Sequence, residues 1–155
     1  MTETTRSANG RGAEVKNDAV KTPVKNGRKV AGLTLKRVFS SGVHPYDEVT
    51  WERRDVVQTN WKTGETVFEQ HNVEFPDFWS VNASTIVTTK YFRGALGSPV
   101  REQGLKQLID RVVHTYRRAG EDFGYFADAE SAEIFEHELT WLLLHQHFSF
   151  NCTTG

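Results

Sequence analysis

The sequence predicts a small, mainly helical α+β fold: a disordered basic tail, a small β-hairpin and then about three helices. Three observations lead to this prediction. Residues 1–30 are rich in Lys and Arg and contain no aromatic residue. Two runs of β-forming residues then flank a turn-compatible Gly64. Three later segments carry apolar residues at helical spacing and start near capping residues.

The tail, residues 1–30, differs in charge from the remainder, residues 31–155, which we expect to be the folded domain. The chain has 19 basic and 20 acidic residues, and the tail holds seven of the former and three of the latter, so the net charges are +4 and −5. A segment with so little apolar surface to bury is expected to be disordered. A basic tail can contact nucleic acid. A solvated leader is the expected role, so nucleic acid is not an expected partner.

Cys152 is the single cysteine in 155 residues. One thiol forms no intrachain disulfide and no Cys-based zinc site. No secretory h-region follows Met1, and no apolar run approaches the roughly 18–20 residues of a membrane span. We therefore expect a cytoplasmic protein with no membrane partner.

The β structure is expected between the tail and the helices. Weak alternation of apolar residues predicts a short strand at Leu33–Phe39. A longer strand is predicted within Val49–Asn60, with a returning strand at Thr66–Glu69. Asn72–Pro76 is expected to be an extended linker, since a proline disfavours helical geometry at the residue before it.

Two helices are predicted next. The first should begin near Ser80, an N-cap type, and run to about Phe92, where glycines follow at positions 94 and 97. The second should begin at Ser98-Pro99, an N-cap followed by a proline at the first helical position, and end around Gly120 and Gly124. Its apolar residues form a single stripe: Leu105, Leu108, Ile109, Val112, Val113 and Tyr116.

A third helix is predicted from near Asp128 to about His147. Its apolar residues cover most of its circumference, which is typical of a helix buried on several sides. They are Ile134, Phe135, Leu139, Trp141, Leu142 and Phe148. The aromatic run Phe75–Trp79 is expected to pack onto a helix, although an interaction surface is the alternative.

The chain's six histidines suggest a metal site, but their spacing does not support one. Glu133 and His137 lie one helical turn apart, whereas His145 and His147 are two residues apart and point to different helix faces. Neither a metal-binding His-Glu-x-x-His motif nor a phosphate-binding glycine motif is present. No catalytic, cofactor-binding or metal-ligating residue is therefore assigned, and the histidines are expected to lie at surfaces or interfaces with satisfied hydrogen bonds.

Four stretches of the sequence resemble the N-terminal region of the adenosylcobalamin-dependent (class II) ribonucleotide reductases. They follow one another in the order found in that family, within about three quarters of the chain, roughly Val38 to Asn151. The stretches are VHPYDEVTWERRDVV (Val43–Val57), VEFPDFWSVNASTIVTTKYFRGALG (Val73–Gly97), LKQLIDRVV (Leu105–Val113) and AEIFEHELTWLLLHQHFSFN (Ala132–Asn151).

The resemblance implies an oxidoreductase that makes deoxyribonucleotides, from ribonucleoside diphosphates, for DNA synthesis. In the full-length family, adenosylcobalamin homolysis yields a thiyl radical on one cysteine, which takes the ribose 3′-hydrogen. A second cysteine pair, recharged by a thioredoxin-type reductant, supplies the electrons. The catalytic unit of the family is an α/β barrel that follows the region resembled here.

The resemblance also implies that this chain is not active alone. The mechanism needs at least three cysteines, and this sequence has one. Asn151 matches the family, whereas Cys152 stands where the family has a serine close to the substrate. Asn151 and Cys152 are thus the candidate substrate-binding residues, no catalytic residue is carried over, and this chain alone is not expected to bind adenosylcobalamin.

The departure from the family pattern begins at Cys152, and the apolar run before it reaches Phe150. We therefore expect a domain that is incomplete at its C-terminal end and a third helix with an exposed apolar surface, because the barrel is missing. The alternative function is a small helical binding module whose basic tail contacts nucleic acid or a protein.

Overall fold

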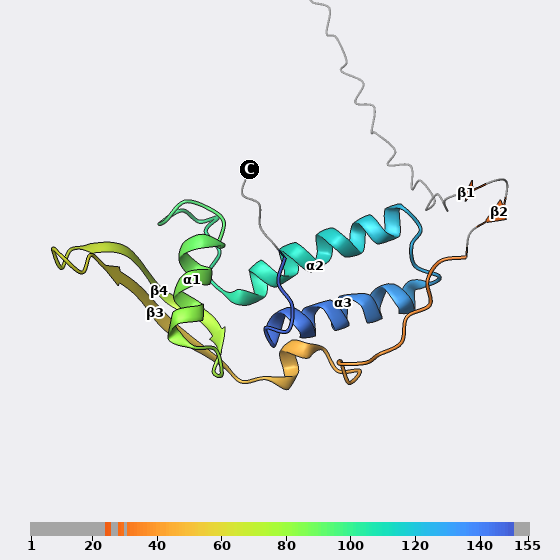
Figure 1. Cartoon of the computed structure of the whole chain (residues 1–155), viewed down its shortest axis with the longest axis horizontal. Coiled ribbons are helices and arrows are strands. Elements are labelled where there is room, and N and C mark those ends of the chain that lie inside the picture. Colours follow the sequence, from red (N-terminus) through yellow and green to blue (C-terminus); the bar gives the residue numbers. More distant parts are fainter. Residues whose placement is uncertain (1–23, 26–27, 30, 151–155) are drawn as a thin grey trace, which may run out of the picture.

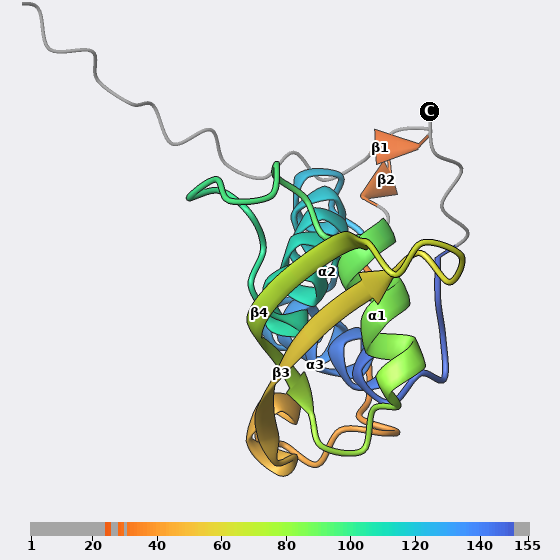
Figure 2. The same cartoon turned by 90° about the vertical axis from the view of Figure 1, so that its left-hand side faces the viewer.

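The structure, a computed structural model, describes residues 24–25, 28–29 and 31–150. Helices α2 and α3 lie side by side, and a β-hairpin with α1 extends beyond their ends (Figure 1). From the side of the hairpin, its strands lie in front of the two long helices, with α1 beside them (Figure 2). The elements are β1 (Val24–Lys25), β2 (Arg28–Lys29), the 3-10 helix η1 (Pro45–Glu48), β3 (Trp51–Thr59), β4 (Thr66–Pro76), α1 (Val81–Lys90), α2 (Leu105–Asp122) and α3 (Ala129–Leu144).

The predicted α+β class, with one hairpin and three helices after the tail, is confirmed. Within the predicted tail, β1 and β2 pair antiparallel as a very short hairpin, and the rest of residues 1–30 lies outside the described residues. Over the part of the chain that is described, no helix is long and apolar enough to cross a bilayer.

Strands β3 and β4 form an antiparallel pair that is longer than predicted. The predicted linker at residues 72–76 is wrong, because those residues continue β4 as far as its pairing of Trp51 with Pro76. The pairing of β3 with β4 is interrupted by a bulge in β4, where Asp55 of β3 faces two residues of β4. There Asn72 has a φ of 58°, and its backbone N–H donates to Asp55 Oδ1 at 2.9 Å.

The strand predicted at residues 33–39 is not part of either hairpin. Leu33 alone makes an isolated parallel bridge, with Phe126, and the chain then runs extended along α3 (Figure 1). We call residues 31–44 the strap. Of the three apolar residues in the predicted alternation, Leu35 is half-buried, whereas Leu33 and Val38 are exposed. The strap packs on a helix and the loop before it, so no further strand ladder forms among its residues.

Helix α1 begins as predicted and α2 does not. Ser80 caps α1 by accepting from the Ala83 backbone N–H at 3.1 Å. The predicted start of α2 at residues 98–99 is wrong, because α2 begins at Leu105. The preceding residues run along β4, where Glu74 N–H donates to Gln103 O at 2.9 Å, and this extended path prevents an earlier start. The predicted end of α2 around Gly120 and Gly124 is confirmed, since α2 ends at Asp122 and Gly124 follows with a φ of 65°.

Helix α3 begins at its predicted cap, since Asp128 accepts from the Ser131 backbone N–H at 2.7 Å. Its expected exposed apolar surface is wrong for Ala129–Leu144: every large apolar side chain there is buried or half-buried. The strap, η1 and α2 cover these side chains. The buried core joins both strands to α2 and α3, and Ala83 and Val87 of α1 pack against it. Its buried members are Val56, Val73, Phe75, Trp79, Phe92, Leu105, Ile109, Val113, Leu139 and Leu144.

Arg101 connects the hairpin to the end of α1. Its buried guanidinium donates to the carbonyl oxygens of Thr88, Phe92 (2.6 Å) and Gly94 (3.1 Å), and to Gln70 Oε1 of β4 at 2.9 Å. The carbonyls at a helix end have no partner within the helix. One cation therefore satisfies the end of α1 and fixes it to β4, while burial lowers the pKa of Arg101.

We predict that Arg101→Met lowers the free energy of unfolding by about 3 kcal/mol or more, because several buried oxygens lose a charged donor at once. Urea unfolding followed by circular dichroism measures the change. Arg93→Met, in the same loop but with an exposed side chain, is the control and should change stability by less than about 0.5 kcal/mol. Equal effects of the two substitutions would contradict the proposed role of Arg101.

Candidate functional site

The two predicted site residues, Asn151 and Cys152, lie outside the described residues. The structure does describe the segment that leads to them, residues 145–150 after α3. The contacts of residues 145–150 set the position from which the chain continues to Asn151.

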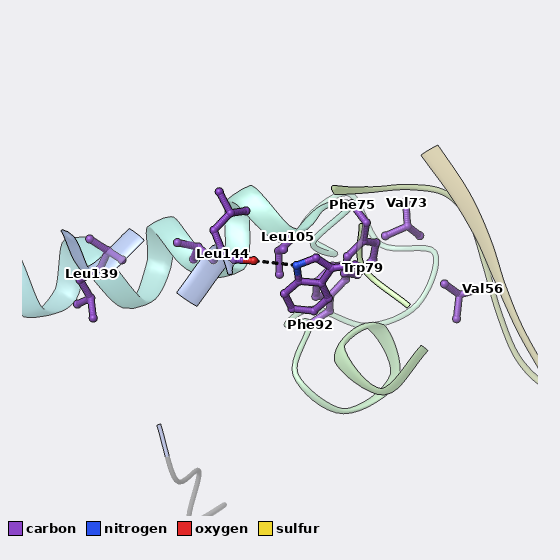
Figure 3. Close-up of a cluster of buried hydrophobic side chains, with 10 residues drawn as sticks. Val56, Val73, Phe75, Trp79, Phe92, Leu105, Leu139 and Leu144 are labelled. Carbon is purple, nitrogen blue, oxygen red and sulfur yellow. Dashed lines mark hydrogen bonds between the residues drawn. The ribbon is translucent and has the colours of Figure 1, made fainter. Parts of the chain in front are cut away.

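The end of α3 is fixed by a tryptophan from the turn after β4. Trp79 is buried, and its Nε1–H donates to Leu144 O at 2.8 Å (Figure 3). The chain then turns at Gln146, which has a φ of 58°, and the His147 backbone N–H closes the turn on Leu142 O at 2.9 Å.

The last described residue is also held. The ring of Phe150 stacks on Tyr116 of α2, with centroids 4.6 Å apart and planes 7° apart. Asn151 therefore follows directly after a residue whose position is set by α2. The predicted packing role of the 75–79 aromatic run is confirmed for Phe75 and Trp79, which are buried, while Phe78 is 47% exposed.

A stack of rings lies at this end of α3. Trp141 is flanked by Phe39 of the strap, at 5.2 Å between ring centroids, and by His145, at 4.2 Å. His145 in turn stacks on Phe78 at 5.3 Å, and His147 lies 5.2 Å from Trp141. Burial, and then the neighbouring His147, lower the pKa of His145, so its neutral ring is favoured within the stack.

Hydrogen bonds hold the strap to α3 at regular intervals. The Leu35 backbone N–H donates to Ser131 Oγ at 3.3 Å. About two helical turns further on, the backbone N–H groups of Phe39 and Ser40 both donate to Glu138 at 2.9 Å. Burial alone would raise the pKa of Glu138, but these hydrogen bonds and that of the Ser40 hydroxyl outweigh it and lower the pKa. Glu138 is therefore held ionised by the strap.

Between the hydrogen bonds at Ser131 and at Glu138 lies a polar contact that the sequence did not indicate. Arg37 Nη1 donates to His137 Nδ1 at 2.9 Å, and Arg37 Nη2 lies 3.3 Å from Glu133 Oε1. The ring of His44 meets that of His137 edge-on at 5.0 Å. Burial first, and then the nearby His44 and Arg37, lower the pKa of His137. An arginine only donates, so the bonded ring nitrogen of His137 must be unprotonated.

Possible metal ligands and surface hollows among the described residues bear on cofactor binding. No group of three His, Cys, Asp or Glu side chains is placed to hold a metal in the part of the chain that is described. Two shallow hollows, of about 240 and 210 Å³, lie beside His71 and beside Leu142, respectively. Both volumes are below the roughly 300–1,000 Å³ of pockets for drug-sized ligands, and a corrinoid is larger than such ligands.

The remaining histidines have acidic partners, as expected of surface histidines. His71 lies between Asp55 Oδ2 at 3.1 Å and Glu69 Oε1 at 2.7 Å. Hydrogen bonds that the His71 ring donates to these carboxylates, Asp55 first, raise the pKa of His71. His114 lies 3.3 Å from Glu136. The two histidines thus differ from His137, whose partner is a cation.

Comparison with known proteins identifies the relatives of this chain. The sequence profile of the family described as "Class II vitamin B12-dependent ribonucleotide reductase" matches residues 53–146. A Vitamin B12-dependent ribonucleotide reductase of Streptomyces clavuligerus is 61% identical over 152 residues, which is 97% of this chain and 15% of that protein. Proteins of the same name from Streptomyces avermitilis and Streptomyces coelicolor are 66% and 69% identical over 81% and 77% of this chain. The chain spans 12% to 15% of the length of these three curated relatives.

We predict that Trp79→Phe lowers the free energy of unfolding by about 1–3 kcal/mol, since Leu144 O would stay buried without its donor. Chemical unfolding curves measure the change. Trp61→Phe is the matched control: Trp61 is 87% exposed, so this substitution should cost less than about 0.5 kcal/mol. If Trp79→Phe were as mild as the control, the end of α3 would not depend on this hydrogen bond.

Proposed function

Because the chain belongs to the family of class II vitamin B12-dependent ribonucleotide reductases, we propose that it acts as the N-terminal part of an enzyme that makes deoxyribonucleotides for DNA synthesis. The substrates of that enzyme would be ribonucleoside diphosphates. Its cofactor would be adenosylcobalamin, and a thioredoxin-type protein would recharge its thiols.

The observation that carries this proposal is the range of the family match. Residues 53–146 begin in β3 and end just beyond α3, so the match covers nearly all of the hairpin and all three helices. The matched residues are therefore those of the hairpin-and-helix fold itself. The strap and η1 lie before the matched range.

The role of this portion within the enzyme would be structural. Adenosylcobalamin, when bound to the enzyme, supplies radical initiation, and the reduction consumes thiols. The chain has one cysteine, Cys152, and no three potential metal ligands come together among the described residues. Alone, it would therefore neither bind the cofactor nor reduce a nucleotide. We also propose a cytoplasmic location, in keeping with this single cysteine.

We assign Asn151 and Cys152 to the edge of the substrate pocket. The support is positional: Phe150, directly before them, is held on Tyr116, and α3 is held by Trp79. A residue that contacts substrate needs such a fixed approach, since small displacements weaken catalysis strongly. In this proposal the hairpin, α2 and α3 together set where the polypeptide enters the substrate pocket.

A chimera tests the proposal. Its first 155 residues would be this sequence, and the rest would be the corresponding remainder of the Streptomyces clavuligerus relative, 61% identical over the shared region. We predict adenosylcobalamin-dependent reduction of ribonucleoside diphosphates within about tenfold of the unaltered relative, because the buried contacts lie within the exchanged part. Product formation is measured by chromatography of the deoxynucleotides.

The control is the 155-residue chain alone in the same assay, which should show neither turnover nor adenosylcobalamin binding at micromolar concentration. A chimera that melts cooperatively but does not reduce nucleotides would contradict the proposed function. Cofactor binding by the 155-residue chain would contradict the structural role.

A further inference from the structure

We propose that residues 31–44 form a pH-sensitive strap, whose closure on α3 requires His137 to be neutral and whose release exposes the apolar side of α3. The inference goes beyond the proposed reductase function and depends only on contacts within residues 31–150.

The geometry places a proton-sensitive group at the middle of the strap. His137 is 9% exposed, and its Nδ1 accepts a hydrogen bond from Arg37 Nη1 at 2.9 Å. A protonated imidazole has no free lone pair, so protonation at Nδ1 removes the acceptor and sets two cations against each other. The same change brings positive charge towards His44, whose ring lies 5.0 Å away.

Acidic groups near His137 are already engaged, so they compensate little for its protonation. Glu133 lies beside Arg37, and its side chain is 55% exposed. Glu136 is held by two residues of α2, with His114 at 3.3 Å and Arg117 in closer contact. From η1, Tyr46 packs against His44 at 4.7 Å, and its hydroxyl donates to Asp110 Oδ1 at 2.8 Å. The charged and titratable groups around His137 are thus Arg37, His44, Glu133, Glu136, His114, Arg117, Tyr46 and Asp110.

The sign of the effect follows from burial. The pKa of His137 is lowered from its ordinary 6.5 in the closed state. When the strap is open, His137 has its ordinary pKa, and when the strap is closed its pKa is lower. The closed state is therefore fully favoured above the ordinary pKa, and it loses that advantage as the pH falls towards the lowered pKa. The strap is therefore closed above about pH 6.5 and opens at lower pH. Glu138, with a lowered pKa, stays ionised in this range and keeps its own contacts from titrating.

Opening would uncover a defined surface. The strap places Phe39 on Trp141 at 5.2 Å, and Leu35 lines a hollow together with Phe135, Leu139 and Leu142 of α3. Without the strap, this side of α3 would be apolar and open to water. The pH of the surroundings would thus control access to α3.

Amide hydrogen exchange of the 155-residue chain tests the inference. The backbone N–H groups of Leu35, Phe39 and Ser40 each donate to an α3 side chain and report on closure. Their protection factors, corrected for intrinsic rates, should fall about tenfold between pH 7.5 and pH 5.5, the order expected for the loss of one charge-assisted hydrogen bond. Amides of the β3–β4 ladder should not change. Unchanged strap protection over this range would overturn the proposal.

Three variants assign the effect. His137→Gln keeps an acceptor and cannot titrate, so its strap protection should be the same at both pH values. Arg37→Gln removes the opposing cation and should reduce the pH dependence, which keeps the proposal testable if His137→Gln does not fold. His71→Gln, on the exposed hairpin, should retain the full pH dependence. Wild-type pH dependence in His137→Gln, or its loss in His71→Gln, would overturn the role of His137.

Discussion

The contact of Arg101 with the end of α1 and with β4 is the interaction on which the arrangement of the hairpin depends. A two-stranded sheet is marginal by itself in water. Here the buried guanidinium of Arg101 holds β4, because it bonds both Gln70 of that strand and the carbonyls of residues 88, 92 and 94. Because the Thr88 carbonyl lies in the last turn of α1 and the other two lie in the segment just after it, the same cation holds the end of α1 and positions it.

Several other parts of the fold use the same device, a polar side chain that crosses to a backbone group of a distant element. Arg54 of β3 donates to Ser84 Oγ at 2.8 Å and to Asp77 O at 2.9 Å, and so fixes the turn that carries Trp79. Trp79 then fixes the last turn of α3 through Leu144. The chain of contacts thus runs from the hairpin to the segment before Asn151, which explains how a hairpin far from that segment can influence its position.

The sequence was sufficient where local chemistry decides the structure. Ser80 and Asp128 cap helices as expected, and Gly64 lies in the turn between β3 and β4 with a φ of 73°. The sequence was insufficient where a residue's conformation depends on a partner far away in the chain. Ser98-Pro99 is a good helix start, yet these residues form only a turn, closed by Arg101 N–H on Ser98 O, and the chain then bridges to β4 at Gly104 before α2 begins. Nothing local shows that residues 33–39 would lie on a helix.

The same reason limits prediction of the candidate site. Arg37 and His137 are 100 positions apart in the sequence, and neither belongs to a motif, so their contact could not be foreseen. The candidate substrate-binding residues, Asn151 and Cys152, were found only by resemblance to a family, and both lie outside the described residues. The histidines had been expected to be satisfied at surfaces or interfaces; His137 is instead buried, with an arginine as its partner.

Because Arg101, Arg54 and Trp79 join the hairpin to α1 and α3, we expect the hairpin and the helices to form one cooperative unit. Native-state hydrogen exchange at increasing denaturant tests it most directly, because it gives an opening free energy for each amide. In one cooperative unit, the most protected amides of β3 and β4 open with the same free energy as those of α2 and α3, to within about 1 kcal/mol. Hairpin amides that opened several kcal/mol more easily, without the helices, would contradict it.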